Sequence, residues 1–562
     1  MTYTAVTFAP VQSFIRSSRK LRDLYGSSLL LSHLGRALYD DAIKKLGKDA
    51  VISPAEVKST RGVPNTLLIQ GAYSRADAEK ALLSAWSQAL LACRSWLENL
   101  PQKGTEWEAA AWGPDRWEAG WGASWKACER HSWEVFQGQG ATIQEAEDAL
   151  RCAKQRRAWE IPNWTGESST LSSTEAVVRP RMAEKHDPRL AHSDAHASEA
   201  RALIRLLRHS GNLGEAFGDE NEEISLSEMV KRMVTYRQIA NTAFGVSEGA
   251  PLADILPERF ERTSMQVPSS EKERPETIVW FMADGDQVGD HLRRLGDASD
   301  QAQARRAFSS SMRSWAANLY RDVPDHLGDN RATVVYAGGD DIFGALHESK
   351  PGQRDLRRED LFHWLRLFPK LWAKNELWAT KEKPDLTASM GLVWADSQVP
   401  QREALQHARD AESIAKARGR DRFALRLVYA GGNHVQWTCP WGWLDSILSS
   451  YRDREGRSTT ATVTSNDRGA KWRHLAEDLH WLQERHAIGD AIHLGAREVS
   501  AKAAANARAE AVATGLLNSY FPGWQPPSPP ETGRRLDQWL IDLGRVMAGL
   551  ERWRDCPMEN TP

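Results

Sequence analysis

Two acidic turns carry the side chains of this chain that are best suited to chemistry. Asp284-Gly285-Asp286 follows the apolar run 277–283, and Gly338-Gly339-Asp340-Asp341 separates the apolar runs 332–337 and 342–346. Apolar runs joined by so tight a turn predict a hairpin, and its glycines let another molecule approach the backbone. Hard cations such as Mg²⁺ prefer carboxylate oxygens, often together with substrate phosphates. If the two turns converge, they outline a two-metal nucleotidyl-transfer site; taken alone, the second turn also fits a solvated hairpin tip.

The order of the surrounding elements predicts that the two turns lie side by side. Hydrophobic periodicity predicts strands over 277–283, 332–337, 342–347, 386–394 and 422–429, and helices over 300–321, 358–375 and 402–418. The series begins as β-α-β-β-α-β, the ferredoxin-like split unit. In that topology the first strand neighbours the central hairpin, so Asp284 is expected beside Asp340 and Asp341.

A basic pair stands at the end of the last predicted helix in this series. Lys416 and Arg420 are four residues apart, either on one helix face or with Arg420 just past the helix end at Gly419. A lysine point charge and a planar guanidinium at that spacing suit a polyphosphate. An ordinary basic helix C-terminus, favoured by the helix dipole, is the alternative. The position of the pair after the two acidic turns favours a phosphate clamp.

Four motifs follow one another in the second half of the chain: Asp-Gly-Asp-x-x-Gly at 284–289, Tyr-Ala-Gly-Gly-Asp-Asp at 336–341, Thr-Ala-Ser-Met-Gly-Leu at 387–392 and Ala-Lys-x-x-Gly-Arg at 415–420. Together they resemble the palm domains of nucleotide cyclases. More specifically, they resemble the large subunit of type III CRISPR effector complexes. The order of the motifs makes the set more specific than any one of them.

The N-terminal region agrees with this resemblance independently. Residues 8–15, Phe-Ala-Pro-Val-Gln-Ser-Phe-Ile, and the run from Ser18 to Ser32 resemble the opening of the first palm in the Cmr, or type III-B, branch of the family. Val-Pro-Asn-Thr-Leu-Leu at 63–68 is similar to a further strand of that palm. Many relatives carry an N-terminal HD nuclease domain ahead of the first palm. Because this chain opens on the palm strand, and His186-Asp187 stands in a predicted loop, no HD nuclease activity is expected.

The resemblance implies a nucleotidyltransferase that is switched on when its complex captures target RNA. The implied reaction joins ATP molecules into cyclic oligoadenylates with the help of two Mg²⁺ or Mn²⁺ ions. Asp284 and Asp341 are then the leading catalytic metal ligands, with Asp340 a supporting ligand or an orienter. The implied partners are the other subunits of a type III-B complex and, through the complex, a guide RNA and a target RNA.

The resemblance also implies the residues that bind the nucleotide. They are Gly285, Asp286, Gly338, Gly339, Lys416 and Arg420. The hairpin glycines leave room for the nucleotide, the backbone around the first acidic turn contacts phosphate or metal, and the basic pair holds the triphosphate. Three alternatives stay open: the same complex couples ATP to S-adenosylmethionine, the chain is a free-standing nucleotide cyclase, or it is a catalytically silent scaffold. The doubled palm argues against the second alternative, and the retained acids argue against the third.

The predicted fold class is α+β, with two ferredoxin-like palm domains. We expect a first, degenerate palm at 1–140, a mostly helical connecting domain at 141–268, the catalytic palm at 269–432 and a helical bundle at 433–562. The first palm is degenerate because Ala9-Pro10-Val11 ends its first strand and no paired acids occur near 67–71. It is therefore expected to bind a nucleotide or to support the other palm without holding metals. Its basic residues could face phosphates of ATP or RNA or form a solvated face: Arg16, Arg19, Lys20 and Arg22.

The connecting domain offers no zinc site in its sequence. Relatives often carry a cysteine-based site here, but residues 161–169 contain no cysteine and Cys152 stands alone, so four tetrahedral ligands cannot be assembled and no zinc is expected. Tryptophans are dense around it, at 107, 112, 117, 121, 125, 133, 159 and 164. Core packing is the favoured interpretation of that cluster, ahead of base stacking or a partner surface.

The composition of the chain limits which partners and which compartment can be expected. A formal net charge of −2 over 562 residues argues against a general nucleic-acid coat, so RNA is expected to bind through local patches or partner subunits. The five cysteines show no paired spacing, which predicts reduced thiols in a cytoplasmic protein. No signal peptide is evident, and no apolar run approaches the roughly 18 residues that would span a bilayer, so no membrane partner is expected.

Overall fold

The computed structural model describes most of the chain. The described residues are 1–55, 62–100, 119–156, 167–180, 182, 194–209, 211–214, 217–245, 278–295, 300–327, 331–347, 356–378, 386–396, 398–459, 469–490, 499–524 and 533–555. Contacts divide the chain into two compact units. One comprises 1–275, 289–317 and 335–339, and the other comprises 276–288, 318–334 and 340–562.

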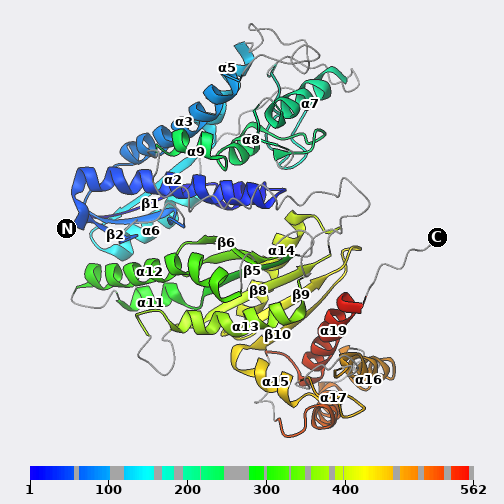
Figure 1. Ribbon diagram of the computed structural model, residues 1–562. Coiled ribbons are helices and arrows are strands. Elements are labelled where there is room, and N and C mark those ends of the chain that lie inside the picture. Colours follow the sequence, from blue (N-terminus) through cyan, green and yellow to red (C-terminus); the bar gives the residue numbers. More distant parts are fainter. Residues whose placement is uncertain are drawn as a thin grey trace. The chain divides into compact units, whose positions relative to one another are not determined.

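The second half of the chain is built on a six-stranded sheet (Figure 1). Its elements in chain order are β5 (Ile278–Gly285), α11 (Val288–Arg294), α12 (Gln301–Leu327), β6 (Ala332–Ala337), β7 (Ile342–Leu346), α13 (Arg358–Ala373), β8 (Ala388–Ala395), α14 (Gln401–Ala417), β9 (Arg422–Val428) and β10 (His434–Pro440). The strand order is β10-β9-β8-β5-β7-β6. The four strands β8-β5-β7-β6 have the order of a ferredoxin-like unit, which confirms the predicted fold of the second palm.

The central strands are buried because helices cover both faces of the sheet. Every residue of β7, β8 and β9 is buried, as expected for strands packed on both sides. Phe281 of β5 packs on Trp364 of α13, with 4.6 Å between ring centroids. Helix α14 covers the opposite face, and Figure 1 shows α13 and α14 on the two sides of the sheet. Strand β9 runs parallel to β8, so the connection between them must cross over, and α14 is that crossover.

The first half repeats this topology around a four-stranded sheet. The strands are β1 (Tyr3–Ala9), β2 (Val51–Ser53), β3 (Thr66–Gln70) and β4 (Glu134–Gly140), in the order β2-β3-β1-β4. The helices that belong with it are α1 (Val11–Arg16), α2 (Leu21–Leu46), α3 (Arg75–Glu98), α5 (Ala119–His131) and α6 (Ile143–Gln155). This order matches β6-β7-β5-β8, which confirms the predicted duplication of the palm.

A glycine at the same place in each sheet lets a helix pack unusually close. A Cβ added at Gly391 of β8 would lie 2.2 Å from the carbonyl oxygen of Ala408 in α14. A Cβ added at Gly138 of β4 would lie 2.3 Å from the carbonyl oxygen of Ala146 in α6. Both distances are far inside van der Waals contact, so each sheet needs glycine under its helix. The two glycines provide a common reference point for comparing the two palms.

The connecting region is mostly helical where it is described, with α7 (Asp194–Arg208), α8 (Leu226–Met233) and α9 (Arg237–Phe244) after α6. Trp121, Trp125 and Trp133 are buried in the core of the first half. Core packing is therefore confirmed for these three, whereas the tryptophans at 107, 112, 117, 159 and 164 lie outside the described residues. Residues 161–166 and the dipeptide His186-Asp187 also lie outside them.

A buried ionic cluster joins the start of α2 to α8. Arg232 is fully buried and donates to Asp23, with Nε 2.6 Å from Oδ1, while its Nη1 lies 2.5 Å from Oε2 of Glu222. Lys20 adds a second cation 3.1 Å from Glu222. Although burial opposes ionisation, Arg232 lowers the pKa of Asp23 and of Glu222. The charges compensate one another in the interior, where an unpaired charge would be costly.

The sheet extends further along the chain than the sequence predicted. A helical region was expected from 433, but β10 pairs antiparallel with β9, with His434 opposite Val428. The turn between them closes on itself, with the Tyr429 N–H donating to the Asn433 carbonyl over 2.9 Å and Gly432 at a φ of +77°. Gly-Gly-Asn at 431–433 is thus a hairpin turn, and the strand after it was missed.

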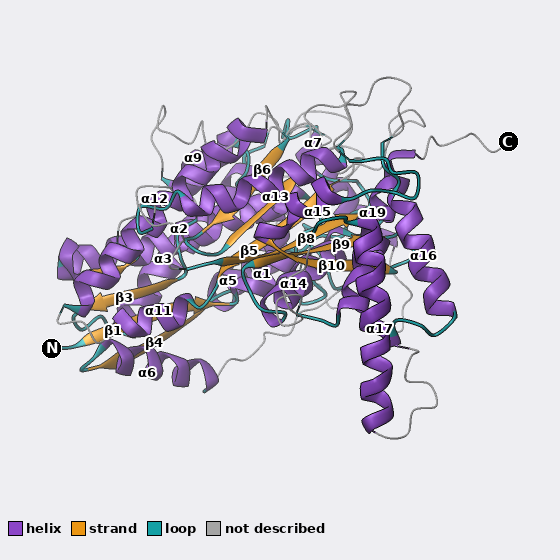
Figure 2. Cartoon of the chain, turned by 90° about the horizontal axis from the view of Figure 1, so that it is seen from below, coloured by secondary structure: helices purple, strands orange, loops and turns teal. Residues whose placement is uncertain are grey.

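The C-terminal region beyond β10 is helical, as predicted. It contains α15 (Leu444–Ser450), α16 (Trp472–Glu484), α17 (Val499–Tyr520) and α19 (Leu536–Asp555), and Figure 2 shows α17 as a long helix extending from this group. Helix α19 is fixed to the sheet because Trp539 Nε1 donates to the Thr438 carbonyl over 2.8 Å. None of the helices in the described ranges is long and apolar enough to cross a bilayer. The four described cysteines are free thiols.

Candidate functional site

Strand register brings the two acidic turns together. β5 and β7 are antiparallel, and Ala283 lies opposite Ile342. Asp284 follows Ala283 on β5, and Asp341 immediately precedes β7, so both carboxylates stand at the same end of the strand pair. They are close enough that the charge of Asp284 helps to raise the pKa of Asp341. The predicted adjacency of Asp284 and the hairpin acids is therefore observed.

Gly285 brings the third carboxylate close. A Cβ at this position would lie 2.9 Å from the Cβ of Asp340 and 2.6 Å from Cγ2 of Val288. Any other residue would push the hairpin tip away from the end of β5. Gly285 therefore acts through close packing, which places Asp340 against the strand that carries Asp284.

The two hairpin glycines have different reasons to be glycine. A Cβ at Gly338 would lie 1.9 Å from the hydroxyl oxygen of Tyr336, so a side chain already fills that space. Gly339 has a φ of +135°, and a Cβ added there would meet nothing within 4 Å. Glycine is needed there for its backbone conformation, although Gly339 itself is buried. Close packing therefore explains Gly338, and backbone conformation explains Gly339.

Lys416 of α14 reaches into the acidic turns. Its ammonium group pairs with the Asp284 carboxylate and lies 2.6 Å from Oε1 of Glu412, one helical turn earlier. Burial opposes the charge, but the hydrogen bonds to both acids outweigh it and raise the pKa of Lys416. The close packing at Gly391 explains this reach, because Gly391 contacts α14 at Ala408 and Glu412. Glu412 was missed from the sequence, although its i,i+4 spacing to Lys416 was visible.

Arg420 does not share a helix face with Lys416. Helix α14 ends at Ala417, and Arg420 stands beyond it in a left-handed conformation with a φ of +60°. Its N–H donates to the Ala415 carbonyl over 3.2 Å, and its side chain is exposed. The structure therefore brings Lys416 to the acids and leaves Arg420 on the turn that follows.

The hairpin carboxylates hold protons more tightly than isolated aspartates. The pKa of Asp340 is raised to about 6, mainly because the surrounding protein removes water from the carboxyl group and secondly because Asp284 carries a like charge. The same causes, with Asp340 and Glu412 added, raise the pKa of Asp341 to about 7. Asp341 is crowded but still exposed, so a ligand can reach it. A cation bound among these groups would relieve their repulsion.

The donor set fits a hard divalent cation. Three carboxylates stand on adjoining strand ends, and the side chain of Asp284 is 34% exposed. Among the described residues no three His, Cys, Asp or Glu side chains are grouped closely enough to hold an ion as they stand. Asp284 is paired with Lys416 through Oδ2 in this conformation, and a carboxylate has a second oxygen that can accept a cation.

Asp286 is engaged inside the fold. Its N–H donates to the Thr387 carbonyl over 2.8 Å, and its carboxylate accepts hydrogen bonds from the hydroxyls of Thr387 and Ser389 and from the Asp421 N–H. Its exposed fraction is 3%. The Asp286 N–H and carboxylate are therefore already engaged within the fold, and the expected contact of the backbone around Gly285 and Asp286 with phosphate or metal stays a prediction for the other backbone groups of this turn. The sequence signal for this network was Thr387-x-Ser389, two hydroxyls on one face of a strand.

The first palm carries neutral side chains where the second carries acids. Gly138 lies opposite Ala5, as Gly391 lies opposite Met282, so Thr7 takes the place of Asp284. Thr7 in turn lies opposite Thr66, which takes the place of Asp341. The two hydroxyls are 3.1 Å apart, and Asn65 Nδ2 donates to Thr7 over 3.2 Å. A neutral, internally hydrogen-bonded set of this kind lacks the charge that a divalent cation needs.

The basic residues predicted to line the first palm are divided by the structure. Arg16 and Arg19 are exposed, but Lys20 and Arg22 are buried. Lys20 pairs with Glu222, and Arg22 Nη1 donates to Thr235 Oγ1 over 2.8 Å. Two of the four cations are therefore internal, so both alternatives, phosphate contact and a solvated face, are wrong for Lys20 and Arg22 and stay open for Arg16 and Arg19.

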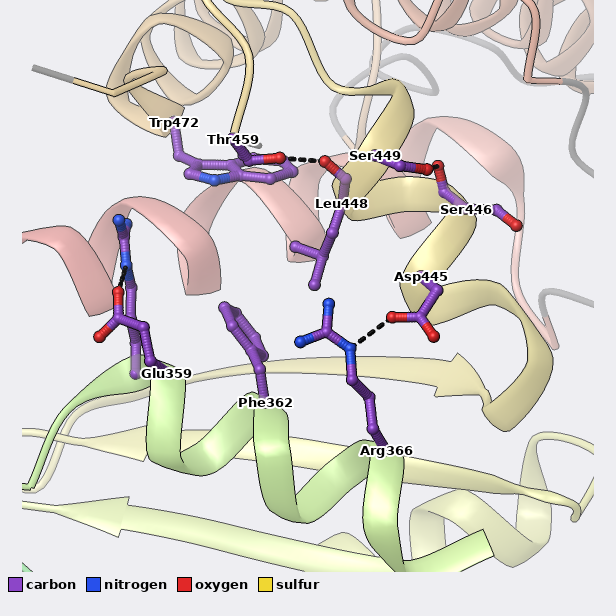
Figure 3. A pocket seen from close by; sticks show the side chains of 10 residues that line it. Glu359, Phe362, Arg366, Asp445, Ser446, Leu448, Ser449, Thr459 and Trp472 are labelled. Carbon is purple, nitrogen blue, oxygen red and sulfur yellow. Dashed lines mark hydrogen bonds and ion pairs between the residues drawn. The ribbon is translucent and has the colours of Figure 1, made fainter. Parts of the chain in front are cut away.

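A cavity of about 540 Å³ lies away from the acidic turns (Figure 3). Figure 3 shows Phe362 and Arg366 reaching into it from α13, opposite Asp445 and Leu448 of α15 and below Trp472. Arg366 pairs with Asp445 across it. None of the predicted site residues lines the cavity. The acidic turns therefore remain the candidate site, because their carboxylates are charged groups that a ligand can reach.

Two family models match the sequence. Residues 3–102 match the N-terminal domain of CRISPR-associated protein Cmr2, and residues 278–424 match the second palm domain of Cas10/Cmr2. Both matches point to one family, and the second includes both acidic turns and Lys416. The chain thus carries Cas10/Cmr2-type domains in both halves and is consistent with a Cmr2-type subunit. None of the curated proteins matches the sequence significantly.

Solved structures share the fold at low sequence identity. A chain of the type III-B Cmr-beta complex in the apo state aligns with a TM-score of 0.51 and 10% identity, over 98% of this chain and 82% of that chain. A chain of the Csm1–Csm4 cassette in complex with cA4 aligns with a TM-score of 0.46 and 13% identity, over 97% of this chain and 69% of that chain. The first similarity shows a common fold, and the second is too low to support a functional argument.

Proposed function

We propose that this chain, which carries Cas10/Cmr2-type domains, is the nucleotidyltransferase subunit of a type III CRISPR effector complex and makes cyclic oligoadenylates from ATP. One observation supports this more than any other: Asp284 at the end of β5 and Asp341 just before β7 stand at one end of the strand pair, with Lys416 paired to Asp284. A structural hairpin tip has no need of three crowded carboxylates with a lysine among them. A site that binds a cation and a triphosphate needs both the carboxylates and the lysine.

The reaction joins two nucleotides by attack of a ribose 3′-hydroxyl on an α-phosphate, with pyrophosphate leaving. Asp284, Asp340 and Asp341 would hold divalent cations, which when bound lower the pKa of the attacking hydroxyl and stabilise charge on the phosphate oxygens. Lys416, which pairs with Asp284 in this conformation, would contact a phosphate oxygen of the bound nucleotide. The nucleotide would approach the hairpin turn beside Asp341, which is exposed. Arg420 is exposed on the turn after α14 and would meet the outer phosphates.

The partners follow from the family. We propose that the chain assembles with the other subunits of a type III-B complex, and that guide RNA and target RNA reach it through them. The first palm then contributes scaffold or nucleotide contacts without metal, since Thr7, Asn65 and Thr66 replace the acids. The Cmr-beta chain with the same fold belongs to such a complex.

Mass spectrometry of the products tests the proposal. The purified complex would be incubated with ATP, Mn²⁺ or Mg²⁺ and target RNA, with and without S-adenosylmethionine. We expect cyclic oligoadenylates that require target RNA and the divalent cation. A product that contains the methionine moiety would replace the proposed product with a conjugate, and the absence of any new phosphodiester product would leave a scaffold role.

A further inference from the structure

The turn after α14 holds an unusual backbone conformation. Gly419, Arg420 and Asp421 follow one another with φ values of +125°, +60° and +49°. The left-handed region is costly for residues other than glycine, and such conformations persist only where the surroundings hold them. Two of these three residues are not glycine. The turn therefore needs an anchor.

Asp286 is that anchor. Its Oδ2 accepts the Asp421 N–H over 3.0 Å and the Thr387 hydroxyl over 2.8 Å, and its Oδ1 accepts the Ser389 hydroxyl over 2.7 Å. A buried carboxylate is tolerated only when donors satisfy it, and here three do. Arg422 adds a further contact, because its Nε donates to the Arg420 carbonyl over 2.8 Å.

The anchor joins the two halves of the candidate site. Asp286 is two residues after Asp284 on the same strand end, and Asp421 is five residues after Lys416 at the end of α14. One carboxylate thus fixes the end of the acidic strand to the end of the basic helix. Arg420 immediately precedes the anchored N–H, so the direction of its side chain depends on the same contact.

We propose that Asp286 is a positioning residue for binding of the ATP triphosphate. It holds the end of α14, which carries Lys416, and the turn after it, which carries Arg420, against the strand end that carries Asp284. The inference rests on the proposed function of this site and adds a role for a carboxylate that touches neither metal nor nucleotide. The positioning role requires a hydrogen-bond acceptor at residue 286 and does not require a charge. This requirement distinguishes Asp286 from a metal ligand such as Asp284, two residues earlier.

The asparagine and alanine variants distinguish the two roles. In Asp286→Asn the remaining oxygen can still accept from Asp421 and Thr387, and the amide can donate to the Ser389 hydroxyl, so the turn stays anchored. In Asp286→Ala the anchor is lost. We expect the ATP dissociation constant, measured by equilibrium dialysis with Mg²⁺ present, to rise about tenfold for alanine and less than about threefold for asparagine. Equal damage in both variants would identify a metal ligand and overturn the proposal.

A double-mutant cycle separates positioning from a general loss of structure. If Asp286 acts through Lys416, then Asp286→Ala in a Lys416→Ala background should weaken ATP binding by much less than its single effect, whereas additive losses would contradict the proposal. Thr387→Val, which removes one donor and keeps the carboxylate, should weaken binding about two- to threefold and serves if the alanine variant does not fold. Parent-like affinity in both Asp286→Ala and Thr387→Val would also refute the inference. Because ATP binding is the readout, these outcomes do not depend on which product the site makes.

Discussion

Gly391→Ala should change the geometry of the candidate site while leaving every one of its side chains in the sequence. Gly391 lies on β8 beneath α14, and the backbone of α14 at Ala408 and Glu412 is what it contacts, not the three aspartates or Lys416. A Cβ there would come within 2.2 Å of the Ala408 carbonyl oxygen and 2.3 Å of the Glu412 nitrogen, whereas ordinary van der Waals contact begins near 3.4 Å. Both obstructing atoms belong to helix backbone, so no side-chain rotation relieves the clash.

The size of the effect follows from this clash. Helix α14 must retreat from the sheet by about 1 Å, and Lys416 moves with it, away from Asp284. A displacement of that size in a catalytic group can reduce the rate about 100-fold. The overpacked interface should also lower the free energy of unfolding by about 1–3 kcal/mol. The loss of activity should therefore exceed what the loss of stability explains at a temperature where the variant is folded.

The assay is nucleotide synthesis by the assembled complex, with thermal unfolding of the isolated chain measured alongside. Gly431→Ala is the matched control, because a Cβ at that position has no atom within 4 Å and lies on the turn before β10. We expect near-parent activity in the control and about a 100-fold loss in Gly391→Ala. Parent-like synthesis by Gly391→Ala would refute the claim that the packing of α14 on β8 positions Lys416.

Three further predictions follow from charged groups in the structure. Lys416→Met should weaken ATP binding about ten- to a hundredfold, since charge-assisted hydrogen bonds contribute about 1.5–3 kcal/mol, and titration calorimetry would measure it. The pKa of Asp341 is raised to about 7 from an ordinary 3.8, so its protonated form stabilises the fold below about pH 3.8 and that contribution is lost as the pH rises through about 7. Asp341→Asn should therefore raise the melting temperature of the protein in EDTA at pH 8, by an amount that shrinks at lower pH; no gain at pH 8 would contradict the raised pKa. Arg232→Met should lower the free energy of unfolding by about 3–5 kcal/mol in urea titrations, because it leaves Asp23 and Glu222 buried without their cation. A change under about 1 kcal/mol would show that this cluster contributes little to stability.

The sequence predicted the parts of the fold that depend on local pattern. Apolar runs bounded by glycine and aspartate located the strands of the second palm to within a few residues, and the ferredoxin-like order then required Asp284 to neighbour the hairpin acids. The strand β10 was missed because its exposed first residues, His434 onward, lack the continuous apolar run of its neighbours. The Gly-Gly-Asn turn ahead of it was the available signal.

Other features could not be predicted from the sequence because they depend on distant partners. Lys20 and Arg22 look like a solvated basic face until residues about 200 positions later, Glu222 and Thr235, supply their partners. Asp286 looks like part of the nucleotide site until Thr387, Ser389 and Asp421 converge on it. In both cases the residue type suggested a ligand site, and tertiary hydrogen bonding assigned it to the interior.

The central claim is that the carboxylates at the end of β5 and β7 carry out nucleotidyl transfer. Its most direct test compares the parent complex with the Asp340→Ala, Asp341→Ala double variant for pyrophosphate release from ATP in the presence of target RNA and Mn²⁺. Because a hairpin tip contributes little to the core, the variant should assemble and bind target RNA as the parent does, yet release no pyrophosphate above background. Unchanged pyrophosphate release from a fully assembled variant would contradict the claim.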